Sequence, residues 1–367
     1  MDKKLKAVLC GATFGQFYIE ALTRLSEKFE IVGLLARGSE KSRKCADFYN
    51  VPLFTSIDEV PENTDIAFVI LRSGILGGVA DDYVKYFLEH KIHVFQEFPV
   101  HPKKAEENFK LSIKNKVCYC IGDFYVRLPQ IRKFISHVKE LNEICSPSHI
   151  QFSCSTAVSL PAVMMLREML PSSKNIDLKC LSENETPFQI ISGTADSVPI
   201  TAEVHNETNT KDPDSAMYIL QSFNVIYETG RLSIQDPFGS IYWYSKVKSS
   251  SKRYESGAAA RFSDNESTDG CILLAPPENI HSQHDMTEIW INAIITDIDE
   301  MLESISNKTF YIKKSQSELS GLKFWDKFSK LTGFPKRIDG EKVTAEQKNL
   351  LNLKITEWAE NERNEIT

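Results

Sequence analysis

The chain has 367 residues, which is enough for two domains of ordinary size. It carries 43 Lys and Arg against 50 Asp and Glu, so its net charge is -7 and it lacks the basic composition typical of a nucleic-acid-binding protein. It contains no apolar run of about 18 residues and no signal-peptide core, so we expect no membrane contact and a cytoplasmic location. The eight cysteines form no C-x-x-C pair, which indicates free thiols in a reducing compartment.

Strand and helix patterns alternate along the first 125 residues. Short, almost wholly apolar runs predict strands at 6–10, 31–35, 66–71, 92–95 and 117–121. Apolar residues at helical spacing predict helices between them, at 17–28, 42–49, 79–90 and 102–114. Strands that are apolar on both faces and separated by helices are typical of a parallel sheet covered on both sides. We therefore predict an α/β fold in which a doubly wound domain spans residues 1–124.

The pattern changes after residue 125. A helix is expected at 129–141, followed by alternating stretches at 150–155, 198–205, 217–227, 231–235 and 240–246. The polar, Ser-rich segment 249–269 predicts a long loop, and helices are expected at 285–305, 316–331 and 344–360. Thr344 and Gln347 form a capping box at the start of the last helix. Residues 125–367 are thus predicted to form an α+β domain with an open, mainly antiparallel sheet.

The turn after the first predicted strand carries small residues where a dinucleotide fingerprint carries glycines. A pyrophosphate bound here would lie at the N-terminus of the following helix. The alternative is that small residues serve only the tight turn. The residues predicted to bind the cofactor in this turn are Gly11, Ala12, Thr13, Phe14 and Gly15.

The end of the second predicted strand indicates which nucleotide is bound. An NAD site places Asp or Glu about 20 residues after the glycines, to hold the ribose 2′-hydroxyl. This chain has Arg37 there, followed by Ser39 and Arg43, and guanidinium groups with a hydroxyl suit a 2′-phosphate. We therefore expect NADPH as the cofactor; a solvated basic loop is the alternative.

Two further segments follow strands on the ligand side of the predicted sheet. Leu71, Arg72 and Ser73 end one strand, and residues 96–101 follow the next. This layout resembles the Gfo/Idh/MocA oxidoreductases, in which the second motif is normally Glu-Lys-Pro with a catalytic Lys. Phe98 stands at the Lys position here. Within that superfamily the chain is similar to the thiazolinyl imine reductases of siderophore biosynthesis, a resemblance carried by residues 10–18, 71–73, 77–78, 97–102, 125 and 128–129.

The resemblance implies an N-terminal NADP-binding Rossmann domain and a specific reaction. A thiazoline, held as a thioester on a carrier domain of a nonribosomal peptide synthetase, would be reduced at its C=N bond to a thiazolidine. NADPH would supply the hydride, and a protein group would protonate the nitrogen. The same resemblance implies a homodimer. The residues that it assigns to cofactor binding beyond the first turn are Leu71, Arg72, Ser73 and Glu97.

His101 and Tyr125 match the proton donors proposed for these reductases. A histidine has an ordinary pKa of about 6.5 and is the more apt acid, whereas tyrosine, at about 10, needs assistance. Each has an alternative role, His101 as a helix cap and Tyr125 as a core aromatic.

Two other functions remain open: oxidation or reduction of a free sugar or cyclitol, and non-catalytic sensing of NADP. Phe98 in place of Lys weighs against the first of these. We expect no metal site, because His281 and His284 lack a third ligand nearby in the sequence. Tyr242 and Tyr244 alternate on a predicted strand and are expected to serve packing or a subunit interface.

Overall fold

A computed structural model of the protein describes residues 4–170, 175–182, 186–209, 217–246, 257, 270–339 and 343–366. The loop predicted at 249–269 lies outside these residues, apart from residue 257. None of the helices in the described part is long and apolar enough to cross a membrane.

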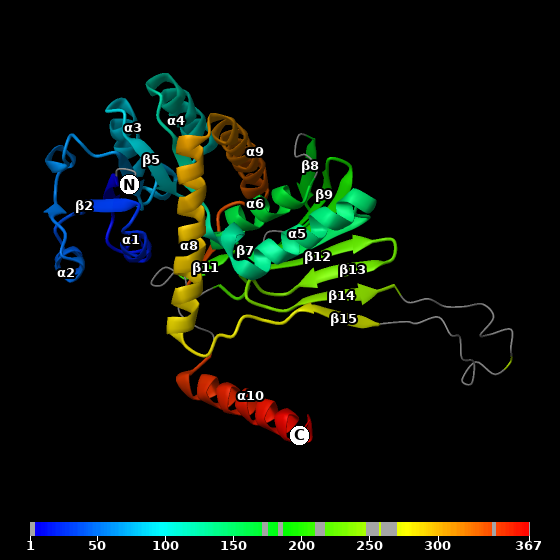
Figure 1. Ribbon diagram of the computed structural model, residues 1–367. Coiled ribbons are helices and arrows are strands. Elements are labelled where there is room, and N and C mark those ends of the chain that lie inside the picture. Colours follow the sequence, from blue (N-terminus) through cyan, green and yellow to red (C-terminus); the bar gives the residue numbers. More distant parts are fainter. Residues whose placement is uncertain are drawn as a thin grey trace.

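The first sheet is parallel and has six strands in the order β3-β2-β1-β4-β5-β6 (Figure 1). Alternate residues of β1 point to opposite faces, so Leu9 packs with α1 and Val8 packs with α3 and α4. This confirms the doubly wound sheet. The strands are β1 (Leu5–Cys10), β2 (Phe29–Leu35), β3 (Leu53–Phe54), β4 (Ile66–Val69), β5 (His93–Glu97) and β6 (Tyr119–Gly122). The helices are α1 (Gly15–Arg24), α2 (Glu40–Tyr49), α3 (Ala80–Glu89) and α4 (Pro102–Asn115), with the short turns η1 (Ile57–Glu59) and η2 (Gly74–Leu76).

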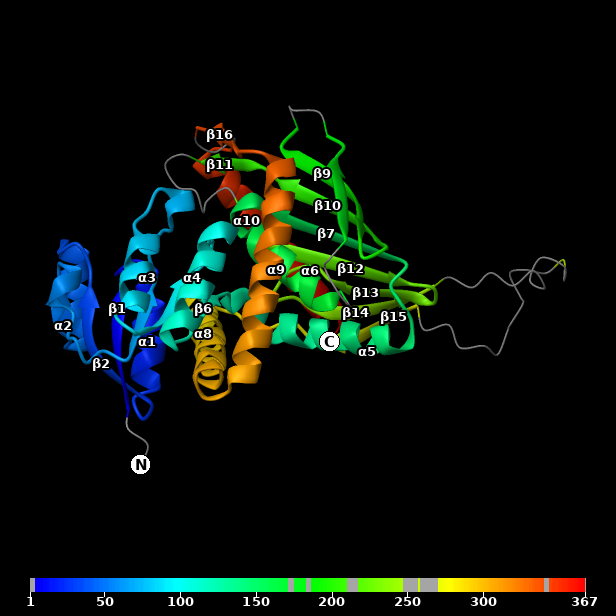
Figure 2. The same ribbon diagram turned by 90° about the horizontal axis from the view of Figure 1, so that it is seen from above.

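The second sheet has eight strands in the order β15-β14-β13-β12-β7-β10-β9-β8, and only β7 and β10 pair in parallel. Helices α5, α6 and α9 cover one face (Figure 2). The mainly antiparallel second sheet is therefore confirmed. Its strands are β7 (His149–Ser155), β8 (Ile176–Cys180), β9 (Phe188–Ala195), β10 (Val198–His205), β12 (Gln221–Tyr227), β13 (Gly230–Ile234), β14 (Ile241–Ser245) and β15 (Cys271–Ala275); β11 (Glu207–Asn209) pairs with β16 (Lys336–Ile338).

The remaining helices connect and cover the two sheets. They are η3 (Phe124–Arg127), α5 (Pro129–Ile144), η4 (Thr156–Val158), α6 (Ser159–Met169), α8 (Gln283–Ser306), α9 (Lys308–Thr332) and α10 (Ala345–Ile366). Helix α8 returns to the first domain and packs against α1, so it joins the two halves of the molecule. The capping box predicted for α10 is present, because Gln347 N donates to Thr344 Oγ1 at 3.2 Å and Thr344 N donates to Gln347 Oε1 at 2.9 Å.

Helix α6 and the strands β3, β8, β9, β11, β15 and β16 were not predicted from the sequence. Helix α6 is apolar on nearly every side, so it shows no amphipathic period. Its Pro161 also suggests an interruption, yet it lies in the first turn, where no intrahelical N–H bond is lost.

Candidate active site at the ends of the parallel strands

The turn between β1 and α1 is shaped by Gly11. Its φ is +106°, and a Cβ there would lie 2.3 Å from the carbonyl oxygen of Ile70, so no other residue fits without a backbone shift. The helix then begins at Gly15, at the end of β1, and the N–H groups of Gln16 and Phe17 donate to the carbonyl oxygens of Thr13 and Phe14. The predicted loop residues 11–15 therefore lie together where a pyrophosphate could bind. The side chain of Phe14 instead packs against Phe124 of η3, with ring centroids 5.7 Å apart.

The cationic residues predicted to select NADPH lie just past β2. Arg37 and Arg43 are exposed, and neither forms an ion pair with the part of the chain that the structure describes. Ser39 is the N-cap of α2, where its Oγ accepts from Ser42 N at 3.3 Å. A helix N-terminus flanked by two unpaired guanidinium groups favours an anion. These positions fit a 2′-phosphate.

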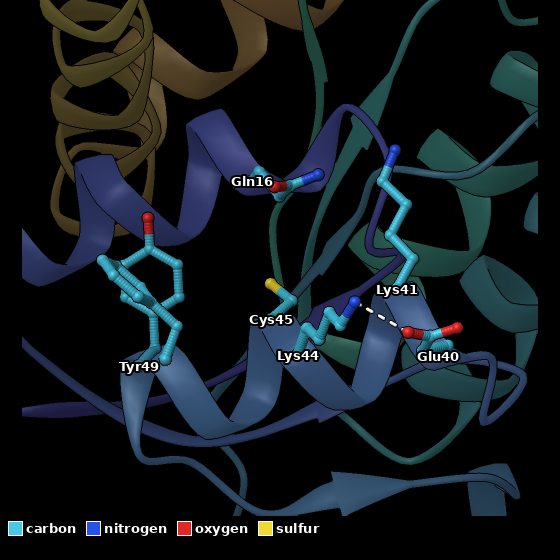
Figure 3. Close-up of a pocket in the computed structure, with 7 residues that line it drawn as sticks. Gln16, Glu40, Lys41, Lys44, Cys45 and Tyr49 are labelled. Carbon is cyan, nitrogen blue, oxygen red and sulfur yellow. Dashed lines mark ion pairs between the residues drawn. The ribbon is translucent and has the colours of Figure 1, made fainter.

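A hollow of about 610 Å³ opens between Gln16, in the first turn of α1, and the length of α2 (Figure 3). Lys44 is paired there with Glu40 at 2.7 Å, while Lys41 extends away from that ion pair. Tyr49 closes the other end by donating from its hydroxyl to Glu20 at 3.0 Å. Lys41 thus adds a third cation to Arg37 and Arg43 at this end of the sheet. Its lining residues are Gln16, Glu40, Lys41, Lys44, Cys45, Phe48 and Tyr49.

The loops after β4 and β5 are tied together. Ser73 is buried, and its Oγ donates to the carbonyl oxygen of Pro99 at 2.5 Å. Gly78 is required nearby, because a Cβ there would lie 1.8 Å from the carbonyl oxygen of Arg72. The predicted cofactor residues Leu71 and Arg72 are half-buried and exposed, respectively. Ser73 therefore fixes the loop after β4 to the loop after β5. Of Leu71, Arg72 and Ser73, only Arg72 has a side chain that is exposed to a ligand.

Glu97 ends β5 and accepts a hydrogen bond from the hydroxyl of Tyr18 in α1. Burial raises the pKa of Glu97 well above its ordinary value; the Tyr18 bond opposes this rise, and the carboxylates of Asp297 and Asp123 add to it. Tyr18 was missed by the sequence analysis, since a tyrosine on the inner face of a helix carries no signal of its own. The pair places a carboxyl group with a raised pKa at the end of β5.

His101 is the N-cap of α4, and its Nδ1 accepts from Lys103 N at 3.2 Å. This is the alternative role considered for it. A cap that accepts at Nδ1 places the proton of a neutral imidazole on Nε2.

Tyr125 lies in η3, 8% exposed, with its ring 4.5 Å from that of Phe124 and 6.4 Å from that of Phe98. The structure therefore brings Tyr125 together with the residue at the Lys position of the family motif. Phe98 also packs against the core cluster that contains Val100, Leu160 and Leu322. The ends of β5 and β6 thus carry an apolar wall with one phenol beside it.

A buried group of charges lies past β6, between the two domains. Arg127 Nη2 is 2.6 Å from Glu300 Oε2, and Lys314 Nζ is 2.9 Å from the same oxygen and 3.2 Å from Glu318 Oε1. Asp297 is 1% exposed and accepts from the backbone N–H of Asp123 at 2.8 Å. These groups border a cavity of about 340 Å³ enclosed by η3, α6, α8 and α9.

The pKa values of Asp123, Asp297 and Glu318 in this cluster are raised. Burial raises the pKa of Asp123 to about 7; Asp297 adds to the rise, while Arg127 and the backbone N–H groups of Tyr125 and Val126 offset part of it. Burial likewise raises the pKa of Glu318 to about 7 against the attraction of Lys314. Burial alone would lower the pKa of Lys314, but Glu318 and Asp297 outweigh it and keep the ammonium charged.

Comparisons with known proteins agree with the first domain. Residues 5–123 match the model of the Gfo/Idh/MocA family, described as an oxidoreductase family with an NAD-binding Rossmann fold. No curated protein matches the chain by sequence.

Solved structures show the same fold over most of the chain. An oxidoreductase from Agrobacterium radiobacter in complex with NAD+, L-tartaric acid and magnesium is 10% identical, with a TM-score of 0.65 over 87% of this chain and 94% of that one. A 3-ketoreductase variant from Actinomadura kijaniata in complex with TDP-benzene and NADP is 11% identical, with a TM-score of 0.61 over 92% and 100%. A UDP-N-acetylglucosamine 3-dehydrogenase from Acidithiobacillus ferrooxidans is 9% identical, with a TM-score of 0.60 over 90% and 100%. At these identities the likeness concerns the fold.

Proposed function

We propose that this chain, whose residues 5–123 form an NAD-binding Rossmann domain of the Gfo/Idh/MocA oxidoreductase family, is an NADPH-dependent reductase of a carrier-bound thiazoline. The observation that carries the proposal is Phe98, packed beside Tyr125 where the family motif has its Lys. Oxidation of an alcohol needs a base to take its proton, and Phe98, at the position of the motif's Lys, cannot serve as one. Reduction of a C=N bond needs only a proton donor, and a flat sulfur heterocycle suits an apolar wall.

The residues past β1, β2 and β4 suit NADPH. The backbone around Gly11 and the start of α1 fit a dinucleotide, and Arg37 and Arg43, exposed and without an ion pair among the described residues, fit its 2′-phosphate. NADPH supplies the hydride when it is bound. The chain contributes orientation, an apolar surface and the proton.

Two groups are candidates for moving that proton. Reduction adds a hydride to the imine carbon and a proton to the nitrogen, and the C=N bond becomes a single bond. Because Nδ1 of His101 accepts the cap, the neutral imidazole carries its hydrogen on Nε2, and this residue would donate from there. The phenol of Tyr125 lies beside Phe98 and can donate directly or hold a water.

The substrate class implies a protein partner. A thiazoline held as a thioester on a carrier domain arrives on a flexible tether, so the carrier must dock near the ends of β5 and β6. The carrier domain of a nonribosomal peptide synthetase is therefore the proposed partner.

The experiment follows NADPH oxidation with a synthetic thiazoline thioester, and NADP+ reduction with myo-inositol and a panel of sugars. Turnover on the thioester alone supports the proposal. Turnover on a cyclitol or a sugar would instead establish a dehydrogenase of the kind found among the structural neighbours, and tight NADPH binding without any turnover would establish a sensor.

Variants then separate the two proton candidates. General acid catalysis typically contributes about 10²–10⁴-fold, so loss of the true donor should lower kcat by that range with NADPH affinity unchanged. His101→Asn keeps a capping group and Tyr125→Phe keeps the ring, so each removes only the candidate proton. Near-normal turnover in the double variant would show that neither residue donates and that positioning dominates.

A further inference from the structure

Gln96 is a polar residue in the interior of the first sheet. It lies on β5 and is fully buried, and alternation along the strand puts it on the same face as Val94, whose apolar cluster includes side chains of α3 and α4. A buried amide is unfavourable unless its polar atoms form hydrogen bonds, and a β-branched residue would suit the interior of a strand better. The presence of a glutamine here therefore has to be explained by the bonds that it forms.

Both ends of the Gln96 amide have a partner. The hydroxyl of Tyr119, which is itself fully buried on β6, donates to Gln96 Oε1 at 2.6 Å. Gln96 Nε2 donates in turn to Oδ1 of Asp81, in the first turn of α3, at 3.3 Å. A carboxylate only accepts hydrogen bonds, so Asp81 requires the NH2 end of the amide and leaves the amide oxygen to Tyr119. The two bonds together fix the orientation of the amide.

The second oxygen of Asp81 binds the loop after β4. Gly74, the first residue of η2, donates from its backbone N–H to Asp81 Oδ2 at 3.0 Å. A Cβ at Gly74 would lie 2.8 Å from that oxygen, so the glycine allows the carboxylate to approach this closely. A continuous chain of hydrogen bonds thus runs from Tyr119 in the interior of the sheet through Gln96 and Asp81 to the backbone of η2.

The loop that this chain reaches carries Arg72, an exposed cation beside the turn after β1. Strand β4 pairs with β1, and Leu71 Cδ2 lies 3.0 Å from the position that a Cβ on Gly11 would take. The carbonyl oxygen of Arg72 also accepts from the backbone N–H of Ala80, at the start of α3, at 3.2 Å. Arg72 therefore belongs to a short, bonded loop that adjoins the proposed pyrophosphate site.

We propose that Asp81 and Gln96 are positioning residues for the cofactor. They hold the loop at Gly74 so that the guanidinium of Arg72 is available to the phosphate groups of the nucleotide. This inference rests on the proposed binding of NADPH and does not depend on the substrate. A buried chain of hydrogen bonds in which each member has a partner favours one arrangement of the groups that it joins. A loop that is already ordered also loses less conformational entropy when the nucleotide binds.

Hydrogen exchange of the nucleotide-free protein tests the chain of bonds. Asp81→Ala removes the acceptor of the Gly74 N–H, so the amides of residues 72–79 should exchange about tenfold faster. Gln96→Met keeps the size of the side chain but removes both of its hydrogen bonds, and it should accelerate the same amides. Asp82→Ala, at the exposed neighbour of Asp81, is the matched control and should leave them unchanged. Unchanged exchange in an Asp81→Ala variant that unfolds in urea like the wild type would show that the chain does not hold the loop.

Fluorescence titration with NADPH tests the consequence for the cofactor. Asp81→Ala should raise the dissociation constant about tenfold, and Arg72→Met should raise it at least as much. The double variant should bind NADPH no more weakly than Arg72→Met alone, because Asp81 is proposed to act through Arg72. If the two losses instead multiply in the double variant, Asp81 does not act through Arg72 and the positioning role is wrong.

The same titration separates this inference from the proposed function. A wild type that does not bind NADPH would refute the proposed function, and this inference with it. A wild type that binds NADPH, together with an Asp81→Ala variant that binds it equally tightly, would refute this inference alone. Tighter binding by the wild type and Asp82→Ala than by Asp81→Ala supports it.

Discussion

The two ends of the ligand-side edge of the first sheet hold their cations in opposite ways. Past β2, Arg37 and Arg43 are exposed and have no ion-pair partner among the described residues. Past β6, Arg127 and Lys314 are largely buried and lie within 4 Å of Asp297, Glu300 and Glu318. An exposed cation without an ion-pair partner is available to bind a ligand. A buried cation surrounded by carboxylates instead connects the elements that carry those carboxylates.

The difference assigns a role to each end. The exposed arginines contribute little to folding, because exposed charges are well solvated and screened. The buried charges come from η3, α8 and α9. Glu318 and Asp297 also accept from the backbone N–H groups of Ile121 and Asp123, so the cluster ties the second domain to the end of β6. Substitutions at the two ends should therefore act on different measurements, cofactor affinity at one and unfolding at the other.

The largest effect is expected from Lys314→Met. This change leaves Asp297, Glu300 and Glu318 without their ammonium partner, and breaking a buried ion pair costs about 3–5 kcal/mol. Urea unfolding should show that loss. Lys313→Met, at an exposed lysine that borders the same cavity, should change the free energy of unfolding by less than about 0.5 kcal/mol. Equal midpoints for the two variants would show that the buried cluster does not join the domains.

The next effect is on cofactor choice. Arg37→Asp replaces a proposed 2′-phosphate partner with a repelling carboxylate, so NADPH affinity should fall roughly ten- to hundredfold while NADH affinity changes little. Fluorescence titration with both nucleotides measures this. Arg132→Asp, at an exposed arginine of α5, controls for net charge. Equal affinity of the wild type for NADH and NADPH would remove the argument from Arg37, Ser39 and Arg43.

The sequence reveals one end of this edge better than the other. Arg37 and Arg43 follow a recognisable strand within a few residues, so counting along the chain was enough to propose their role. The buried cluster joins residues far apart, as in the bond between Asp123 and Asp297, 174 positions away. No local pattern links such residues, and each taken alone looks like an ordinary charge on a helix.

The same reasoning separates the elements that were found from those that were missed. The strands of the first sheet are short apolar runs between amphipathic helices, so they show in the sequence. Helix α6 lies between the sheet and the other helices and is apolar all round, which removes the helical period. For His101 the sequence left two roles open, and the structure shows the cap without testing the chemistry.

A smaller effect, dependent on pH, is expected from Asp123→Asn. The folded pKa of Asp123 is about 7, above the roughly 3.9 of an unfolded Asp, so the folded state holds more protons between these values. Its contribution to stability is complete below about pH 4 and is lost as the pH rises to about 7. The amide does not ionise, so Asp123→Asn should gain on the order of 2 kcal/mol relative to the wild type between pH 5 and pH 8. Asp299→Asn, on an exposed part of α8, should show no such trend.

The smallest effect concerns the cap of α4. His101→Ala removes the Nδ1 acceptor from Lys103 N–H, and loss of an N-cap costs about 1 kcal/mol. His101→Asn restores an acceptor of the kind that N-caps favour, so it should unfold at nearly the urea midpoint of the wild type. Both variants lack the imidazole, so any loss of turnover that they share measures its part in the reaction. Only the alanine variant lacks the cap, so any difference in turnover between the two variants measures the effect of the start of α4. If the two variants are equally stable, the cap is not formed in solution.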